Sequence, residues 1–330
     1  MLPRASASVH LETPHPSAAP DNAWAATRKP ATLNRLPGLA GKAESPLWRR
    51  SELVILGYFA YATAVALWLP LEGAIRMRTL GVNISLFAVY LLLALGEAKC
   101  ARRWIGTVRD WLPLALVLLA YREMGWFAPA HHTNELEHGW IVWDRLVLHD
   151  WGLRATIESA GPLLPAALEI CYTLVYVISP LALALLYASG EARQADRFLL
   201  LYLLGAFGSY ALFPYFPSEP PRTVFPDQDM PQIDTVFRQF NWWILGHGGI
   251  HTSVFPSGHV SAAFALAISI FRVLPTRPWI GAAFLIVAVG IFVATIYGRY
   301  HYAVDALAGL LISLAAWLAV ALWERVKGSE

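Results

Sequence analysis

The chain has 330 residues, of which 57% are hydrophobic and only 15% charged, and its formal net charge is +2. Soluble domains carry about 25% charged residues, so this composition excludes an ordinary soluble globular domain and is typical of a membrane protein. The net charge itself says little, because the distribution of charge among the loops matters more than the total. We expect no nucleic-acid partner.

Residues 1–45 differ in composition from the rest of the chain. They contain no apolar run and are rich in alanine, serine and proline. Such a segment buries too little apolar surface to fold alone, so we predict a disordered tail, which the charge pattern below places in the cytoplasm. The lack of an apolar h-region argues against a signal peptide. A transit peptide is the weaker alternative, because Glu12 and Asp21 are acidic.

Eight apolar segments follow, each long enough or nearly long enough to cross a membrane, which takes about 20 apolar residues. The second is short, and Arg122 and Glu123 interrupt the third. The sequence therefore predicts an all-α fold, a polytopic transmembrane helical bundle. The expected spans cover residues 52–70, 80–96, 111–129, 163–188, 198–216, 257–273, 279–297 and 302–323.

Basic residues gather on one side of these spans. They precede the first span and follow the second, fourth, sixth and eighth, which is a single membrane face. The positive-inside rule assigns this face, with both termini, to the cytoplasm of a multi-pass cell-membrane protein. Arg76 and Arg78 are the exceptions, predicted in the first external loop. The basic residues that set the orientation are Arg35, Lys42, Arg49, Arg50, Lys99, Arg102, Arg103, Arg109, Arg193, Arg197, Arg272, Arg277, Arg325 and Lys327.

Two external segments are long. Residues 130–162 mix tryptophan, leucine and charged residues, which suits a helix lying in the membrane interface. Residues 217–256 join the fifth and sixth spans. Their sequence is rich in glycine and aromatic residues, which predicts an ordered loop. Cys100 is expected in a cytoplasmic loop and Cys171 inside a helix nearer the other face, so the two should not pair.

Three short motifs are expected on the outer face, each at the end of a span. "FPSEPPR" (216–222) follows the fifth span, "FPSGH" (255–259) opens the sixth, and "GRYHYAVD" (298–305) lies between the seventh and eighth. They are remote in sequence but share one predicted membrane face. A helical bundle can therefore bring them together into one site.

The second motif suits an anion. Ser257 is placed to cap a helix, whose free N–H groups and positive dipole end attract negative charge. His259 follows in the first turn, so its imidazole is expected to face the same anion.

The third motif supplies a candidate nucleophile or base. His301 and Asp305 are four residues apart, so on a helix they share a face, and the carboxylate can accept the Nδ1–H of the imidazole and leave Nε2 free. Arg222 and Arg299 are planar, permanent cations suited to phosphate oxygens. Such a set can transfer a phosphoryl group without a metal, and we expect neither a metal nor another cofactor.

Pro-Ser-Gly-His followed downstream by His-x-x-x-Asp resembles the type 2 phosphatidic acid phosphatase (PAP2) superfamily. The resemblance covers about residues 111–325 and implies a catalytic core of six transmembrane helices with its active site on the outer face. Two N-terminal transmembrane helices, within residues 46–110, are then expected to precede this core, and a short cytoplasmic tail, 326–330, to follow it.

The same resemblance implies residue roles and a phosphohistidine intermediate. His301 corresponds to the nucleophile, Asp305 to its orienting partner and His259 to the acid that protonates the leaving group. Ser257 and Gly258 correspond to residues that bind the phosphate.

Three positions depart from the common pattern of the superfamily. Tyr215 stands at the usual lysine, Thr223 replaces the proline after Arg222, and Thr295 stands at the usual arginine of the third motif. The Pro-Pro-Arg and Arg-x-His-Tyr-x-x-Asp sequences found instead resemble the branch that contains inositol phosphorylceramide synthases. That branch includes phosphotransferases as well as phosphatases.

These features predict a membrane enzyme that cleaves a phosphate ester or anhydride of a lipid, with lipid phosphate and membrane lipid as its partners. A phosphatase and a head-group transferase share the first half-reaction and differ in whether water or a hydroxylated acceptor takes the phosphoryl group. A transporter or lipid-binding protein that only holds the phosphate is the alternative from another class. The sequence does not indicate an oligomeric state.

Charged residues inside the predicted spans require partners. Arg122 lies about 10 Å from the outer end of the third span, and Glu169 about 9 Å from that of the fourth, at about 1.5 Å per residue. Because sequential spans are usually neighbours, we predict that Arg122 pairs with Glu169 beneath the site, with Glu123 on another face of its helix.

Overall fold

The computed structural model describes residues 47–100, 102–127, 133–250, 252 and 254–328. Every regular element in these ranges is helical, which confirms the all-α prediction. The predicted tail 1–45 lies outside the described residues, as do residues 329 and 330 of the predicted C-terminal tail.

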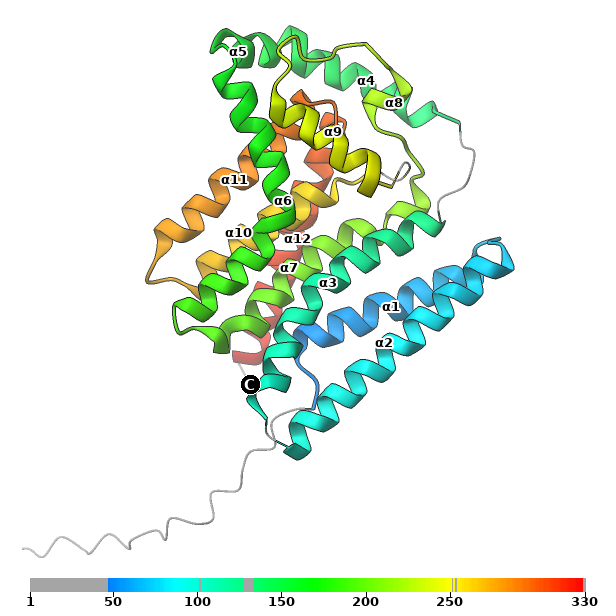
Figure 1. Ribbon diagram of the computed structural model, residues 1–330, viewed down its shortest axis with the longest axis vertical. Helices are drawn as coiled ribbons and strands as arrows, with labels where there is room; N and C mark the ends of the chain where they lie inside the picture. Colours follow the sequence, from blue (N-terminus) through cyan, green and yellow to red (C-terminus); the bar gives the residue numbers. More distant parts are fainter. Residues whose placement is uncertain (1–46, 101, 128–132, 251, 253, 329–330) are drawn as a thin grey trace, which may run out of the picture. The chain divides into compact units, whose positions relative to one another are not determined.

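The first three helices are long and apolar. They are α1 (Arg50–Trp68), α2 (Gly73–Cys100) and α3 (Arg103–Phe127). Figure 1 shows α1 and α2 side by side, and α3 packs against both of them. The second span predicted at 80–96 is thus the middle of a helix of 28 residues.

The prediction that Arg76 and Arg78 lie in an external loop is wrong, because both belong to α2. Arg76 Nε donates a hydrogen bond to the carbonyl of Ala66 (3.2 Å), and Nη2 donates to that of Leu69 (3.3 Å). The guanidinium thereby satisfies carbonyls at the end of α1 that have no partner within the helix. Arg78 stacks on the Trp126 ring, 3.9 Å from its centroid. Both cations therefore have local partners that allow the helix to begin before them.

The segment predicted as an interfacial helix is helical. It consists of α4 (Glu135–Arg145), the π-helical turn η1 (Leu146–Asp150) and α5 (Leu153–Ser159). Helix α4 packs against α12 and α8, so this segment covers the end of the bundle where the third motif lies.

The remaining elements complete the bundle. In chain order they are α6 (Leu163–Ala188), η2 (Ala192–Gln194), α7 (Ala195–Tyr210), η3 (Phe213–Tyr215), α8 (Pro221–Val224), α9 (Val236–Gly248), α10 (Gly258–Val273), α11 (Pro278–Tyr297) and α12 (Ala303–Gly328). The loop 217–256, predicted to be ordered, contains α8 and α9. Cys100 and Cys171 are both free thiols, as expected.

Within the described residues, seven helical segments are long and apolar enough to cross a membrane, namely α1, α2, α3, α6, Ala192–Tyr215, α11 and α12. The remaining predicted span, 257–273, is α10, whose 16 residues make a helix of about 24 Å. A bilayer core is about 30 Å thick, so α10 alone is short for a full crossing.

Helix α10 is the central helix of the bundle, because 12 of its 16 residues are buried. It packs against α7, α11 and α12 (Figure 1). Close approach depends on small residues: a Cβ on Gly205 of α7 would lie 2.4 Å from the Cβ of Ala265 in α10. The second motif is therefore held at the start of the most enclosed helix.

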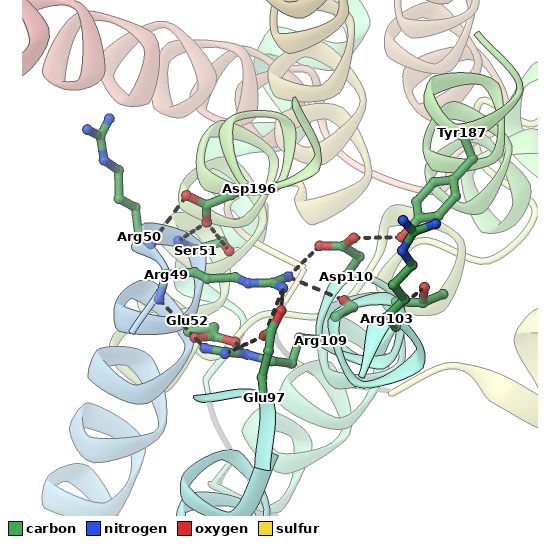
Figure 2. Close-up of polar contacts among 12 residues, drawn as sticks. Arg49, Arg50, Ser51, Glu52, Glu97, Arg103, Arg109, Asp110, Tyr187 and Asp196 are labelled. Carbon is green, nitrogen blue, oxygen red and sulfur yellow. Dashed lines mark hydrogen bonds and ion pairs between the residues drawn. The ribbon is translucent and has the colours of Figure 1, made fainter. Parts of the chain in front are cut away.

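A network of charged side chains connects the two N-terminal helices, α1 and α2, to the rest of the bundle (Figure 2). Arg109 Nη1 donates to Glu97 Oε2 (2.6 Å), and Arg49 Nη1 donates to Asp110 Oδ1 (2.6 Å). The hydroxyl of Tyr187 donates to the other oxygen of Asp110 (2.6 Å). The network lies at the start of α3 and the end of α6, so it joins α1, α2, α3 and α6 at the end opposite the third motif.

Candidate active site

The three motifs predicted to form one site do meet. His301 Nε2 lies 3.4 Å from His259 Nδ1, although 42 residues separate the two in sequence. Both imidazoles, with Gly258 and Arg222, line one cavity of about 480 Å³. The cavity therefore brings one or two residues of each motif to a common surface.

The start of α10 is built for close packing. Ser257 is the N-cap, and its Oγ accepts a hydrogen bond from the backbone N–H of Val260 (3.4 Å). A Cβ on Gly258 would lie 2.5 Å from Cε1 of Tyr210, so only glycine fits there. Gly258 lines the cavity, whereas Ser257 is fully buried and does not. The backbone N–H of Ser257 also donates to the carbonyl of Asp305 (3.0 Å), which joins the second motif to the third.

His301 is almost completely buried and has a carboxylate beside it. Its residue surface is 5% exposed, and its Nδ1 is 3.5 Å from Oδ2 of Asp305. Burial, and then the Arg222 guanidinium, lower the pKa of His301 to about 3. The imidazole is therefore neutral near pH 7, which is the form that can act as a nucleophile or base.

His259 rests on a stack of tyrosines. Its ring lies parallel to Tyr172, with centroids 5.2 Å apart and planes 19° from parallel, and Tyr172 stacks on Tyr300 at 3.9 Å. Tyr176 contacts the His259 ring edge-on. These contacts fix the plane of the imidazole next to His301.

Arg222 is held above the same stack. It lies in the four-residue helix α8, and its Nη1 donates to the carbonyl of Tyr300 (3.2 Å). Its guanidinium carbon is 5.7 Å from the centroid of the Tyr300 ring. One hydrogen bond leaves most of its donors available to the cavity that it lines.

The structure does not place Arg299 in the cavity. Its side chain is fully buried and forms an ion pair with Asp144 of α4, which is also fully buried. The residue has a left-handed backbone conformation (φ 61°), which is uncommon for a residue other than glycine. Its guanidinium thus points into the protein, and Arg222 provides the cation beside the histidines.

Asp144 was missed by the sequence analysis, and it holds the loop that carries His301. One carboxylate oxygen binds Arg299, two residues before the histidine. The other accepts a hydrogen bond from the backbone N–H of Ala303, two residues after it (2.6 Å). Burial raises the pKa of Asp144 to about 6, although the Arg299 charge opposes this. No motif around "WDRLVLHD" identified this role, because it depends on contacts between remote segments.

The predicted ion pair between Arg122 and Glu169 is wrong. Glu169 instead accepts a hydrogen bond from the hydroxyl of Tyr300 (2.6 Å) and one from Nδ2 of Asn241 (2.8 Å). Its other oxygen is 3.4 Å from Nη1 of Arg238. Arg238 and Asn241 come from α9, a helix that the sequence did not place over α6. Arg122 instead lines the cavity.

The rest of the cavity wall is mainly aromatic and aliphatic. No aspartate or glutamate is among the described residues that line it. The lining continues from the histidines along α3 and α6, through Leu114, Leu118, Tyr121, Tyr172, Val175, Tyr176 and Pro180. Within the described part of the chain, no group of three or more His, Cys, Asp or Glu side chains is close enough to hold a metal ion. The site thus combines two imidazoles and two guanidiniums with a long apolar surface.

Comparison with known proteins agrees with this arrangement. Residues 139–319, more than half of the chain, match the family described as the PAP2 superfamily. The chain belongs to the PAP2 superfamily. With seven apolar helices of sufficient length, it is a multi-pass membrane protein.

A curated protein also shows similarity to the chain. It is a PA-phosphatase related-family protein from Dictyostelium discoideum, 42% identical over 60 residues. The matched stretch is 18% of this chain and 10% of that protein, so this chain spans only a small part of its relative. No solved structure matches the chain.

Proposed function

We propose that this protein is a lipid phosphate phosphatase or phosphotransferase that works through a phosphohistidine on His301. The observation that carries the proposal is the pair of imidazoles, whose Nε2 and Nδ1 atoms are 3.4 Å apart, in the wall of a cavity that Arg122 and Arg222 also line. Membership of the PAP2 superfamily supports the same class of chemistry.

In the first half-reaction, Nε2 of neutral His301 attacks the phosphorus of the substrate. The bond between phosphorus and the lipid oxygen breaks, and His259 donates a proton to that oxygen; this step requires the protonated form of His259, which the negative charge of the bound phosphate favours. Asp305, whose Oδ2 is 3.5 Å from Nδ1, stabilises the positive charge that His301 acquires. Arg222 and the positive end of the α10 dipole stabilise the charge on the phosphoryl oxygens.

In the second half-reaction, an oxygen nucleophile attacks the phosphohistidine. His259 accepts the proton of this nucleophile, and the bond between phosphorus and Nε2 breaks. If water attacks, the product is inorganic phosphate. If a hydroxylated acceptor attacks, the product is a new phosphate ester. The second outcome is the reaction of a head-group transferase. The first and third motifs resemble those of the branch that contains such transferases, so transfer to an acceptor is the alternative to hydrolysis within this proposal.

The lining of the cavity favours a substrate with a lipid tail. From the histidines, aliphatic and aromatic side chains continue along α3 and α6, two helices apolar enough to span a membrane. The positive-inside pattern supports an orientation with the site on the outer face and both described ends of the bundle in the cytoplasm.

Turnover by the purified protein separates an enzyme from a transporter or binding protein. We expect long-chain lipid phosphates to be converted in the presence of EDTA, with free phosphate and new lipid products both measured, and with and without inositol as acceptor. His301→Ala should abolish turnover. His247→Ala, an exposed histidine of α9 that does not line the cavity, should retain it. Binding of lipid phosphate with no turnover by the wild-type protein would contradict the proposal and favour the transporter.

A further inference from the structure

Helix α4 presents one side to the motifs that form the candidate site. This side consists of Glu137, Trp140, Ile141 and Asp144, which are three, four and seven residues apart and therefore share a helix face. Asp144 holds the third motif through the contacts described above. The Trp140 ring stacks on that of Phe255 in the second motif, with centroids 5.0 Å apart and planes 26° from parallel. Two motifs thus rest on the same face of α4.

Glu137 connects this face to the first motif. Its side chain is fully buried, and its Oε1 accepts a hydrogen bond from the backbone N–H of Glu219 (2.8 Å). Glu219 lies two residues before the first residue of α8 and three before Arg222. Hydrogen bonds to a carboxylate are stronger than those between neutral groups. The start of α8 is therefore fixed to α4, against which α8 packs (Figure 1).

The other end of α8 is also held by α4. Phe225, the residue after α8, contacts the ring of His138 edge-on, with centroids 5.3 Å apart, and belongs to the same buried hydrophobic cluster as Ile141. A helix of four residues is too short to be stable alone, so these contacts at its two ends determine its position. Arg222, the cavity-lining cation, is part of this short helix.

Resting on the proposed function, we infer that Glu137 is a positioning residue that determines where the Arg222 guanidinium meets the substrate phosphate. Glu137 is not among the described residues that line the cavity, so it acts through Glu219 and α8 without touching the substrate. Loss of its hydrogen bond releases the start of α8 and moves the guanidinium. A misplacement of about 1 Å can reduce a rate by roughly 100-fold.

The first test removes the acceptor oxygen and keeps the length of the side chain. Glu137→Met should lower kcat/KM for a long-chain lipid phosphate by roughly 10- to 100-fold. Glu137→Gln, which keeps an acceptor oxygen for the N–H of Glu219, should retain at least about a fifth of the wild-type value. Glu135→Met changes an exposed residue of the same helix and should have no effect. Equal losses in the two Glu137 variants, or no loss in Glu137→Met, would overturn the inference.

A double-mutant cycle with Arg222 separates positioning from general stabilisation of the fold. In an Arg222→Ala background, adding Glu137→Met should lower kcat/KM by no more than about twofold, because the guanidinium that Glu137 positions is already absent. A residue that only stabilises the fold would reduce kcat/KM by the same factor in both backgrounds. Equal factors would therefore show that Glu137 does not act through Arg222.

A second cycle does not depend on turnover. In a His301→Ala background, Glu137→Met and Arg222→Ala should each weaken the binding of a long-chain alkyl phosphonate by roughly 10-fold, and the two together by no more than Arg222→Ala alone. Additive losses, or an unchanged affinity in Glu137→Met, would contradict the inference even if the protein has no catalytic activity. Failure of the proposed function is recognised separately, as absence of turnover of lipid phosphates by the wild-type protein.

Discussion

Asp144 and Arg299 form an ion pair in which both side chains are fully buried, although 155 residues separate them in sequence. The same carboxylate binds the backbone of Ala303, so Asp144 spans the segment that contains His301. Glu169 holds the neighbouring Tyr300 by its hydroxyl. Two buried carboxylates, from α4 and α6, therefore fix the position of the candidate nucleophile.

Removing one partner of the Asp144–Arg299 pair should destabilise the protein. Arg299→Ala leaves a buried carboxylate without its counter-charge, which costs about 3–5 kcal/mol. Asp144→Ala should cost a similar amount, and the double variant little more than either single variant. Denaturation of the purified protein in detergent measures all three.

Kinetics of the same variants distinguish this structural role from direct phosphate binding. If Arg299→Ala retained wild-type stability but raised KM for lipid phosphates, Arg299 would be the phosphate ligand that the sequence suggested. We propose that role for Arg222, which lines the cavity, so Arg222→Ala should lower kcat/KM by roughly 100-fold, as does loss of a preorganised donor to developing charge, with little change in stability.

The stability of the protein should depend on pH through His301. Its folded pKa is about 3, whereas an exposed histidine has a pKa of about 6.5. Between these values the unfolded chain binds a proton that the folded chain does not. This contribution to stability is therefore fully present above about pH 6.5 and is lost as the pH falls toward about 3.

His301→Gln removes this titration, so its Tm should fall less than that of the wild type between about pH 7.5 and about pH 4.5. The variant is compared with the wild type in the same detergent and buffers. Equal falls in Tm would show that His301 is not held neutral by burial.

Gly258 should tolerate no side chain. A Cβ would meet the Tyr210 ring at 2.5 Å and displace the start of α10, which carries His259. A displacement of about 1 Å at a reacting group can reduce the rate by roughly 100-fold, so Gly258→Ala should lower kcat by at least about 10-fold. Gly246→Ala in α9 is the matched control, because nothing lies within 4 Å of its Cβ position. Similar kcat values for the two variants would contradict this packing argument.

The orientation of the bundle in the membrane can be tested by labelling cysteines in intact cells. Thr223 is exposed in α8 beside the candidate site, whereas Ser218 in the same motif is buried and unsuitable as a probe. A cysteine introduced at Thr223 should react with an impermeant thiol reagent, and the exposed native Cys100 should not. The reverse pattern would place the site on the cytoplasmic face.

Hydropathy predicted the membrane-spanning helices, and the short motifs predicted one common site, in which the structure places His259 and His301 side by side across 42 residues. These features follow from local composition or from the chemistry of a few adjacent residues. Contacts between remote segments could not be predicted in this way. In the sequence, Asp144 is an ordinary acidic residue in an amphipathic stretch. Its role becomes visible only in the structure, where α4 packs over the third motif. Arg122 and Glu169 have opposite charges and lie at similar depths in their predicted membrane spans. Depth does not indicate, however, that α9 places Arg238 and Asn241 next to Glu169.

The most direct test of the account is to trap the covalent intermediate. Wild-type protein is mixed with a lipid phosphate carrying radioactive phosphorus, quenched within milliseconds to seconds, and digested. We expect an acid-labile, base-stable label on the peptide that contains His301, and none in His301→Ala. Turnover by the wild-type protein without a labelled peptide, or a label on a residue other than His301, would contradict it.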